Sequence, residues 1–155
     1  MKKTLIALTV LLAACSKTAD PDLAEGGDRP EPEWIEVCSD VTATVYNAVP
    51  AQCNADYLHT ASMFRIIPER ILEQRVLAME RTMMAQYGIS YGDTVRVEGT
   101  GRWDGEWQVQ DTMNKRFAGQ HKVDLLVPSH IRHGKWDGVR ILRRTRPSTL
   151  YGEAQ

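Results

Sequence analysis

The fold class is decided by residues 94–110, TVRVEGTGRWDGEWQVQ. In its first five residues, Val95 and Val97 alternate with polar side chains, which is the two-residue period of a half-buried strand. Residues 106–110 form a second run rich in β-forming side chains, and the glycine-rich residues 99–105 connect the two. This stretch therefore predicts a β-hairpin.

Other runs of the same kind surround the hairpin, each bounded by turn-forming residues. They are residues 41–46, 123–127 and 139–142. Residues 68–87 instead follow a helical pattern ahead of Gly88, which is placed to cap a helix, and a strand can interrupt the pattern near residues 77–79. These elements predict a small, mainly β barrel with one or two short helices.

The N-terminus has the features of a secretory signal. Lys2 and Lys3 precede an apolar stretch, residues 5–14, which is too short to span a bilayer. The stretch ends in Leu-Ala-Ala-Cys, which resembles the lipobox of bacterial lipoproteins. We therefore expect residues 1–14 to be removed as a signal peptide and Cys15 to be lipidated; the alternative is an ordinary signal peptide with a chance cysteine.

Charge and hydropathy limit the partners of the mature chain. Cleavage leaves 141 residues, and loss of Lys2 and Lys3 leaves 17 cations against 20 anions, so the net charge changes from −1 to −3. This balance argues against a nucleic-acid partner. Acyl chains on Cys15 would supply the membrane attachment, and Ser16 stands where an aspartate would resemble an inner-membrane retention signal. We therefore expect the mature protein to lie at the periplasmic face of the outer membrane, held there by its lipid.

The chain after the signal divides into three parts. Residues 15–36 are poor in large apolar side chains and rich in Pro, Gly, Asp and Glu, which predicts a flexible tether behind the lipidated cysteine. Residues 37–146 are long enough for one hydrophobic core, and residues 147–155 form a C-terminal tail. We expect this single domain to be a monomer.

Two cysteines remain besides the lipidated one. Cys38 and Cys53 would be exported to an oxidising compartment, where a disulfide is the default pairing. Closing a loop of about 15 residues is worth roughly 3 kcal/mol in the chain-entropy model. The alternative is a metal or redox pair, which needs closer spacing or histidine partners.

Two aspartates occupy apolar positions in the predicted strands. Asp111 falls on the same side of its strand as Trp107 and Val109, and Asp124 lies in a run with apolar residues on both faces, so its side chain should enter or border the interior. Desolvation and a second carboxylate raise the pKa of such a group toward the range of a general acid. The alternative is structural, with Asp111 capping the turn at residues 112–114 and Asp124 paired at a strand end.

Six segments carry a family resemblance. They are VTATVYN (41–47), TAS (60–62), YGDTVRVEG (91–99), GEW (105–107), DTMNKR (111–116) and VDL (123–125). Together they resemble the 3D domain, which is named after three aspartates and is similar to the C-terminal part of membrane-bound lytic transglycosylase A and to the stationary-phase muralytic proteins. The resemblance spans about residues 41–142, and DTMNKR followed by VDL is its most specific part.

The resemblance implies a six-stranded double-psi β-barrel and a lytic transglycosylase-like activity. Such an enzyme cleaves the glycan strands of peptidoglycan without water and leaves a 1,6-anhydromuramoyl end. By motif, Asp124 would be the acid/base, and Asp111 would orient it or tune its pKa. The alternative is a peptidoglycan-binding or scaffold lipoprotein that has the same barrel without the chemistry.

Further side chains are candidates for substrate binding. They are Tyr46, Thr60 and Ser62 beside a sugar groove, and Lys115 and Arg116 for the peptide carboxylates of peptidoglycan. Packing, turn or solvated roles are their alternatives. The histidines show no ligand spacing with acidic partners apart from the loose pair of His130 and His133 near a turn, so we expect no metal and no cofactor.

The sequence departs from the 3D pattern at the family's first aspartate. No aspartate occupies that position, and Glu80 or Thr82 falls nearest. Asp93 would restore the count of three, but its setting after Tyr91 and Gly92 is typical of a turn residue. What replaces the first aspartate is a question for the tertiary structure.

Overall fold

The computed structural model describes residues 33–53 and 56–145. The expected signal peptide (1–14), the lipidated Cys15, all but the end of the tether, and the tail (147–155) lie outside the described residues. Within the described ranges, no helix is both long enough and apolar enough to cross a bilayer.

The described chain contains six strands, two short α-helices and three 3-10 turns. In chain order they are β1 (Trp34–Tyr46), η2 (Pro68–Arg70), α1 (Ile71–Gln74), β2 (Val76–Met79), α2 (Arg81–Tyr87), β3 (Thr94–Glu98), η3 (Gly101–Trp103), β4 (Gly105–Thr112), η4 (Lys115–Phe117), β5 (Lys122–Leu126) and β6 (Lys135–Arg144). Every strand predicted from the sequence is present, and β2 divides the predicted helical stretch into α1 and α2. Gly88 ends α2 at a φ of 61°, which confirms the predicted cap.

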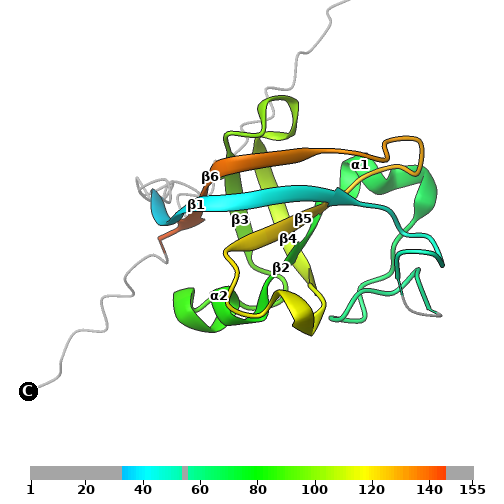
Figure 1. The fold of residues 1–155 in the computed structure, drawn as a ribbon, viewed down its shortest axis with the longest axis horizontal. Helices are drawn as coiled ribbons and strands as arrows, with labels where there is room; N and C mark the ends of the chain where they lie inside the picture. The colour runs from blue at the N-terminus through cyan, green and yellow to red at the C-terminus, as the bar shows by residue number, and fades with distance from the viewer. Residues whose placement is uncertain (1–32, 54–55, 146–155) are drawn as a thin grey trace, which may run out of the picture. The chain divides into compact units, whose positions relative to one another are not determined.

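The strands form a closed barrel in the order β1-β5-β2-β4-β3-β6 (Figure 1). The pairs β1/β5 and β2/β4 are parallel, and the other four pairs are antiparallel. The same order and directions result when β1, β2 and β3 are exchanged with β4, β5 and β6, so the barrel has an internal two-fold relation. The predicted six-stranded, mainly β barrel is confirmed.

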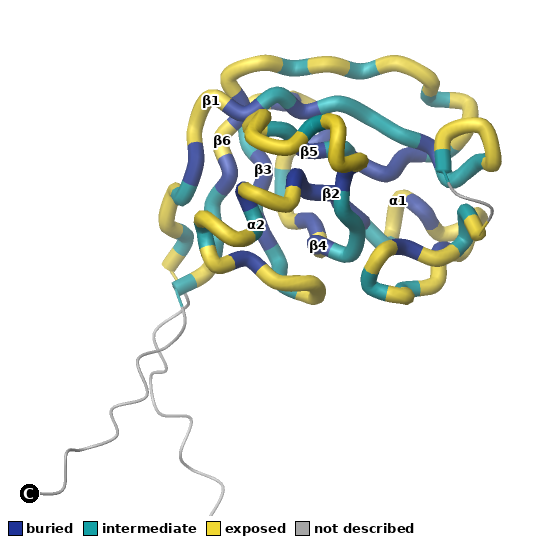
Figure 2. The backbone as a smooth tube through the Cα atoms, turned by 60° about the horizontal axis from the view of Figure 1, so that its bottom comes forward, coloured by how far each residue is buried: buried dark blue, intermediate teal, exposed yellow. Residues whose placement is uncertain are grey.

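The interior of the barrel is filled by apolar side chains from all six strands. In β3, Val95 and Val97 are fully buried between half-buried polar neighbours, as the alternation predicts. Trp107 of β4 is the largest fully buried side chain, and its indole nitrogen donates to the carbonyl of Trp103 at 2.9 Å. Figure 2 shows the buried segments running along the strands, with exposed residues in the connecting loops.

The barrel begins earlier than the predicted boundary at Val37. Trp34 already pairs with Arg144 of β6, and Ile35 pairs with Arg143, so residues 34–36 belong to β1 and not to a tether. The guanidinium of Arg144 lies 5.1 Å from the centre of the Trp34 ring, and that of Arg96 lies 5.6 Å from it. These partners are more than 60 residues away in the sequence, so local composition does not reveal them.

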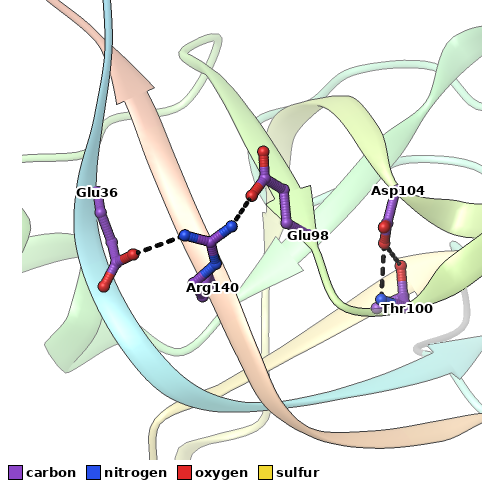
Figure 3. Close-up of polar contacts among 5 residues, drawn as sticks. All are labelled: Glu36, Glu98, Thr100, Asp104 and Arg140. Atoms are coloured by element: carbon purple, nitrogen blue, oxygen red, sulfur yellow. Dashed lines mark hydrogen bonds and ion pairs between the residues drawn. The ribbon is translucent and has the colours of Figure 1, made fainter.

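Arg140 of β6 ties together the two strands beside it (Figure 3). One of its guanidinium nitrogens lies 3.3 Å from a carboxylate oxygen of Glu36 on β1, and the other contacts Glu98 on β3. All three side chains are partly exposed, so the ion pairs contribute little to the free energy of unfolding.

The glycine-rich connection of the predicted hairpin is held by Asp104 (Figure 3). Its carboxylate accepts from the backbone nitrogen of Thr100 at 2.6 Å and from the Thr100 hydroxyl at 2.7 Å. Burial raises the pKa of Asp104, but these hydrogen bonds outweigh it and leave the pKa below its usual value. Gly105 has a φ of 119°, a conformation that a side chain rarely adopts.

The predicted disulfide between Cys38 and Cys53 is wrong in this structure, where both thiols are free. Cys38 lies near the start of β1, with its sulfur 3.7 Å from Nδ1 of His121. Cys53 lies beyond the other end of β1, with its sulfur 3.4 Å from the carbonyl oxygen of Asn47. Eight residues of extended strand at about 3.3 Å each separate the two positions by more than about 20 Å, whereas a disulfide joins Cα atoms within about 7 Å.

Candidate functional site

A second, smaller apolar cluster lies on the outside of the barrel. Ile66 and Ile71 pack there against Val76 of β2 and Leu126 of β5. The segment between β1 and β2, cyan to green in Figure 1, thereby covers part of the outer barrel wall. It leaves an open cleft between itself and the strands.

The cleft has a volume of about 870 Å³. Its lining includes the end of β1, residues 56–61, Ala78 of β2 and the loop from Thr112 to Phe117. Both candidate catalytic carboxylates, Asp111 and Asp124, line it. The cleft is thus built by segments from separate parts of the chain.

The register of the barrel arranges the two aspartates around one alanine. Ala78 of β2 pairs with Asp111 of β4 on one side and with Asp124 of β5 on the other. Thr44 of β1 is the next residue in this row, opposite Asp124. Two strand spacings of about 4.8 Å separate the Cα atoms of the aspartates by about 10 Å, with only the methyl group of Ala78 between the side chains.

The face of Asp111 corrects the expectation from the sequence. Strict alternation would place Asp111 beside Trp107 and Val109, inside the barrel. However, Leu77 pairs with Val109 while Ala78 pairs with Asp111, so Gln110 is an extra residue in β4. This β-bulge turns Asp111 to the outer face, where Asp124 also lies. Asp124 therefore borders the core without entering it.

The Asp111 carboxylate is surrounded by hydrogen-bond donors. One oxygen accepts from the backbone nitrogens of Ala61 at 3.0 Å and Thr112 at 2.8 Å, and the other accepts from the Tyr46 hydroxyl at 3.2 Å. Asp111 therefore joins β1, β4 and the segment before α1. These hydrogen bonds hold the Asp111 side chain in place, as expected of a residue that positions the wall of the cleft.

The Asp124 carboxyl has a different environment. One oxygen accepts from the Thr44 hydroxyl, and the other has no hydrogen bond from any residue that the structure describes. Burial, together with the charge of Asp111, raises the pKa of Asp124 to about 6, although Lys122 and Arg116 act in the opposite direction. A carboxyl group in this range is able both to donate and to accept a proton near neutral pH.

Tyr46 lies between the cleft and the outer apolar cluster. Burial raises the pKa of its hydroxyl well above the usual value, and Asp111 raises it further. The phenol consequently remains protonated and donates to Asp111. The Tyr46 ring therefore lines the cleft, while its hydroxyl is occupied by the hydrogen bond to Asp111.

The hydroxyl candidates Thr60 and Ser62 lie 3.0 Å apart in a mutual hydrogen bond, but they differ in their relation to the cleft. Thr60 lines the cleft, whereas Ser62 does not. The Ser62 hydroxyl donates to the side chain of Gln110 at 2.7 Å, and its backbone nitrogen donates to the Gln110 carbonyl at 3.2 Å. Ser62 therefore fixes the loop onto the β-bulge, a structural role.

Cations line the cleft beside the two aspartates. Lys115 and Arg116, both predicted, are exposed in η4, where Asn114 accepts from the backbone nitrogen of Arg116 at 3.0 Å. Arg81, the first residue of α2, also lines the cleft and was not among the predicted residues. An exposed helix-start arginine has no distinctive pattern in the sequence. Thr44, by contrast, lies inside the VTATVYN motif and was identifiable there.

Glu80 and Asp93, the acidic residues considered as replacements for the first aspartate of the 3D pattern, have structural roles. Glu80 is buried and caps α2 by accepting from the backbone nitrogens of Thr82 at 2.8 Å and Met83 at 3.2 Å. Burial raises its pKa, but these hydrogen bonds prevail and lower it. Asp93 accepts from the backbone nitrogen of Ser90 at 2.8 Å, as expected of a turn residue. Neither side chain lines the cleft.

Comparison with known proteins gives no family assignment. No protein-family model matches the sequence, and no curated protein matches it either. Among residues 33–53 and 56–145, no group of three or more His, Cys, Asp or Glu side chains is arranged to hold a metal ion. The function is therefore inferred from the cleft itself.

The coupling of the two aspartates gives a first prediction. Asp111→Asn removes a charge that raises the pKa of Asp124, so we expect that pKa to fall below about 6. Carboxyl carbon chemical shifts followed by NMR against pH measure it. Glu69→Gln, which removes an exposed carboxylate away from the cleft, is the matched control and should leave the pKa of Asp124 unchanged. An unchanged or higher pKa in Asp111→Asn would contradict the coupling.

Proposed function

We propose that this chain is an envelope lipoprotein that binds peptidoglycan glycan strands and cleaves them as a lytic transglycosylase-like enzyme. The observation that carries the proposal is Asp124, an open-cleft carboxyl with a pKa of about 6 that stands across Ala78 from a second aspartate. The resemblance of the segments around Asp111 and Asp124 to the 3D domain supports the same substrate.

The reaction requires one acid/base. Protonated Asp124 donates its proton to the glycosidic oxygen as the bond from that oxygen to the sugar's anomeric carbon breaks. The 6-hydroxyl of the same sugar then attacks that carbon and returns its proton to Asp124, which leaves a 1,6-anhydro ring. Because the attacking hydroxyl belongs to the substrate, the reaction gains from proximity and needs neither water nor a second catalytic carboxylate.

The other residues of the cleft hold and orient the strand. Asp111 and Tyr46 form a fixed wall beside Asp124. The cations Lys115, Arg116 and Arg81 line the cleft. Their charges suit the carboxylates of the peptides attached to the glycan. A lipid on Cys15 would hold the protein at the periplasmic face of the outer membrane, where the polymer lies within reach.

The proposal is tested by incubating the purified protein with isolated sacculi and identifying soluble products by mass spectrometry. We expect fragments that end in anhydromuramic acid. We also expect kcat/KM to fall about tenfold per pH unit above about pH 6, since the protonated form of Asp124 starts the reaction. If the wild-type protein releases no such fragments, or releases ordinary reducing ends, the proposed chemistry is wrong.

A second candidate function is a module that binds the glycan without cleaving it. It is favoured by the structural use of Glu80 and Asp93, since neither carboxylate joins Asp111 and Asp124 in the cleft. Sedimentation with insoluble peptidoglycan distinguishes the two functions. Retention of the protein on the pellet without release of fragments would identify the binding module.

A further inference from the structure

A second hollow adjoins the cleft. It has a volume of about 490 Å³ and is lined by Thr44, Val45 and residues 132–135, which lead into β6. Thr44 and Val45 also line the cleft, so the two spaces meet along β1. The hydroxyl of Thr44 donates to Asp124, which places the start of the hollow next to the proposed acid/base.

Strand pairing continues the row of site residues into the hollow. Lys135 of β6 pairs with Thr44, which pairs with Asp124. Two strand spacings thus separate the Cα atoms of Lys135 and Asp124 by about 10 Å. A ligand whose scissile bond lies at Asp124 therefore has its next groups within reach of residues 132–135.

The lining of the hollow is cationic. Arg132 and Lys135 contribute the positive charge, and no acidic residue lines the hollow. Lys135 makes an exposed ion pair with Asp137 at 3.1 Å, whereas Arg132 forms no ion pair with any residue in the described part of the chain. The charge of this arginine is available to a ligand, which is notable in a chain whose overall charge is negative.

The backbone of the hollow is held in a defined shape. The buried side-chain amide of Asn47 donates to the carbonyls of Val127 at 3.0 Å, Pro128 at 3.0 Å and Ile131 at 3.1 Å. Gly134 packs so closely that an added Cβ would lie 2.6 Å from the ring of Trp136 and 3.1 Å from Val45. The cations are thus presented by a preorganised loop, which lowers the entropic cost of binding.

We propose that this hollow, together with Arg132 and Lys135, is an anion subsite that binds a carboxylate of the stem peptide carried by the sugar next to the bond at Asp124. The inference rests on the proposed function and specifies its substrate as glycan that still carries peptides. The cations Lys115, Arg116 and Arg81 lie in the segments that follow β4 and β2. Arg132 lies in the connection from β5 to β6, and Lys135 is the first residue of β6. Glycan stripped of its peptides has no peptide carboxylate for this subsite, and the lactyl carboxyl group that cleavage exposes on its sugars has to be blocked in the comparison.

The test compares two glycan preparations. Soluble strands with intact stem peptides are titrated with the purified protein. The same strands are then stripped of peptides by an amidase, the lactyl carboxyl groups that this frees are converted to methylamides, and the product is titrated in the same way. We expect the peptide-bearing strands to bind about tenfold more tightly, and the difference to shrink at high ionic strength because the contacts are exposed. The double variant Arg132→Gln with Lys135→Gln should reduce this preference severalfold, since only Lys115, Arg116 and Arg81 then remain for the peptide carboxylates, with binding of stripped strands unchanged.

The control removes two cations elsewhere. Arg70→Gln with Arg102→Gln changes exposed arginines that line neither space, so the preference should persist. Equal binding of both preparations by the wild type, or a preference of unchanged size in the Arg132 and Lys135 variant, overturns the subsite and leaves the proposed function intact. Failure of the wild type to bind either preparation overturns both.

Discussion

Asp124→Asn is expected to abolish release of anhydromuropeptides and, at the same time, to raise the melting temperature of the protein above pH 6. The amide cannot give a proton to the glycosidic oxygen, and loss of general acid catalysis typically costs about 10²- to 10⁴-fold in rate. Its shape still allows the Thr44 hydroxyl to donate to its oxygen, so the cleft should keep its form. Mass spectrometry of digests of sacculi measures the first effect.

The gain in stability follows from the direction of the pKa shift. The pKa of Asp124 is raised from 3.8 to about 6 by folding. Below the lower value the carboxyl is protonated in both states, and between the two values the unfolded chain loses its proton while the folded chain keeps it. The free energy of unfolding of the wild type therefore falls as the pH rises through this window, by roughly 3 kcal/mol.

The asparagine variant lacks this ionisation. Its melting temperature should therefore exceed that of the wild type by about 10 °C at neutral pH and be similar to it near pH 4. Asp137→Asn is a matched control, because hydrogen bonds from Thr42 and Lys135 lower the pKa of that exposed carboxylate and no rise is expected. Undiminished release of fragments by Asp124→Asn, or a stability difference that is independent of pH, would contradict the assignment.

Ala78→Leu is expected to reduce both glycan binding and cleavage by about a hundredfold or more. Ala78 is the residue between Asp111 and Asp124 in the row across β4, β2 and β5. A leucine side chain there would fill the floor of the cleft and displace the sugar from Asp124, and a displacement of about 1 Å is enough to cost about 10²-fold. Binding to soluble strands and the rate of fragment release measure the effect.

Ala78→Ser is the matched control for the cleft floor. Serine adds one oxygen at a position that already faces the cleft, so the variant should retain binding within a few-fold. Because position 78 faces outward from the barrel core, Ala78→Leu should also keep a cooperative unfolding transition. Wild-type binding by Ala78→Leu would mean that the strand does not pass between the two aspartates.

Local patterns determined the elements of this fold. The alternation around Val95 and Val97 identified β3, the helical period before Gly88 identified α2, and both are present in the structure. A strand rises and alternates in the same way whatever its partner, and a glycine cap acts on its own helix, so such features are legible in a single sequence. An acidic residue within an apolar strand is also recognisable in a single sequence, and it identified Asp111 and Asp124 as candidates.

Pairing between distant strands decided the rest. The bulge at Gln110 moved Asp111 from the expected inner face to the outer one, and the extended length of β1 separated Cys38 from Cys53. Neither result is encoded in the local period, because a bulge is defined only against a partner strand and a separation only by the path of the chain.

The sequence by itself therefore determined which residues form strands and helices and which side chains are chemically able to act. Only the tertiary structure decided which of those side chains meet. The row from Lys135 through Thr44, Asp124 and Ala78 to Asp111 crosses five strands from distant parts of the chain, and barrel closure alone sets its register. The physical reason is that strand register minimises the free energy of the whole barrel, a sum over all six strand pairings that no single segment contains.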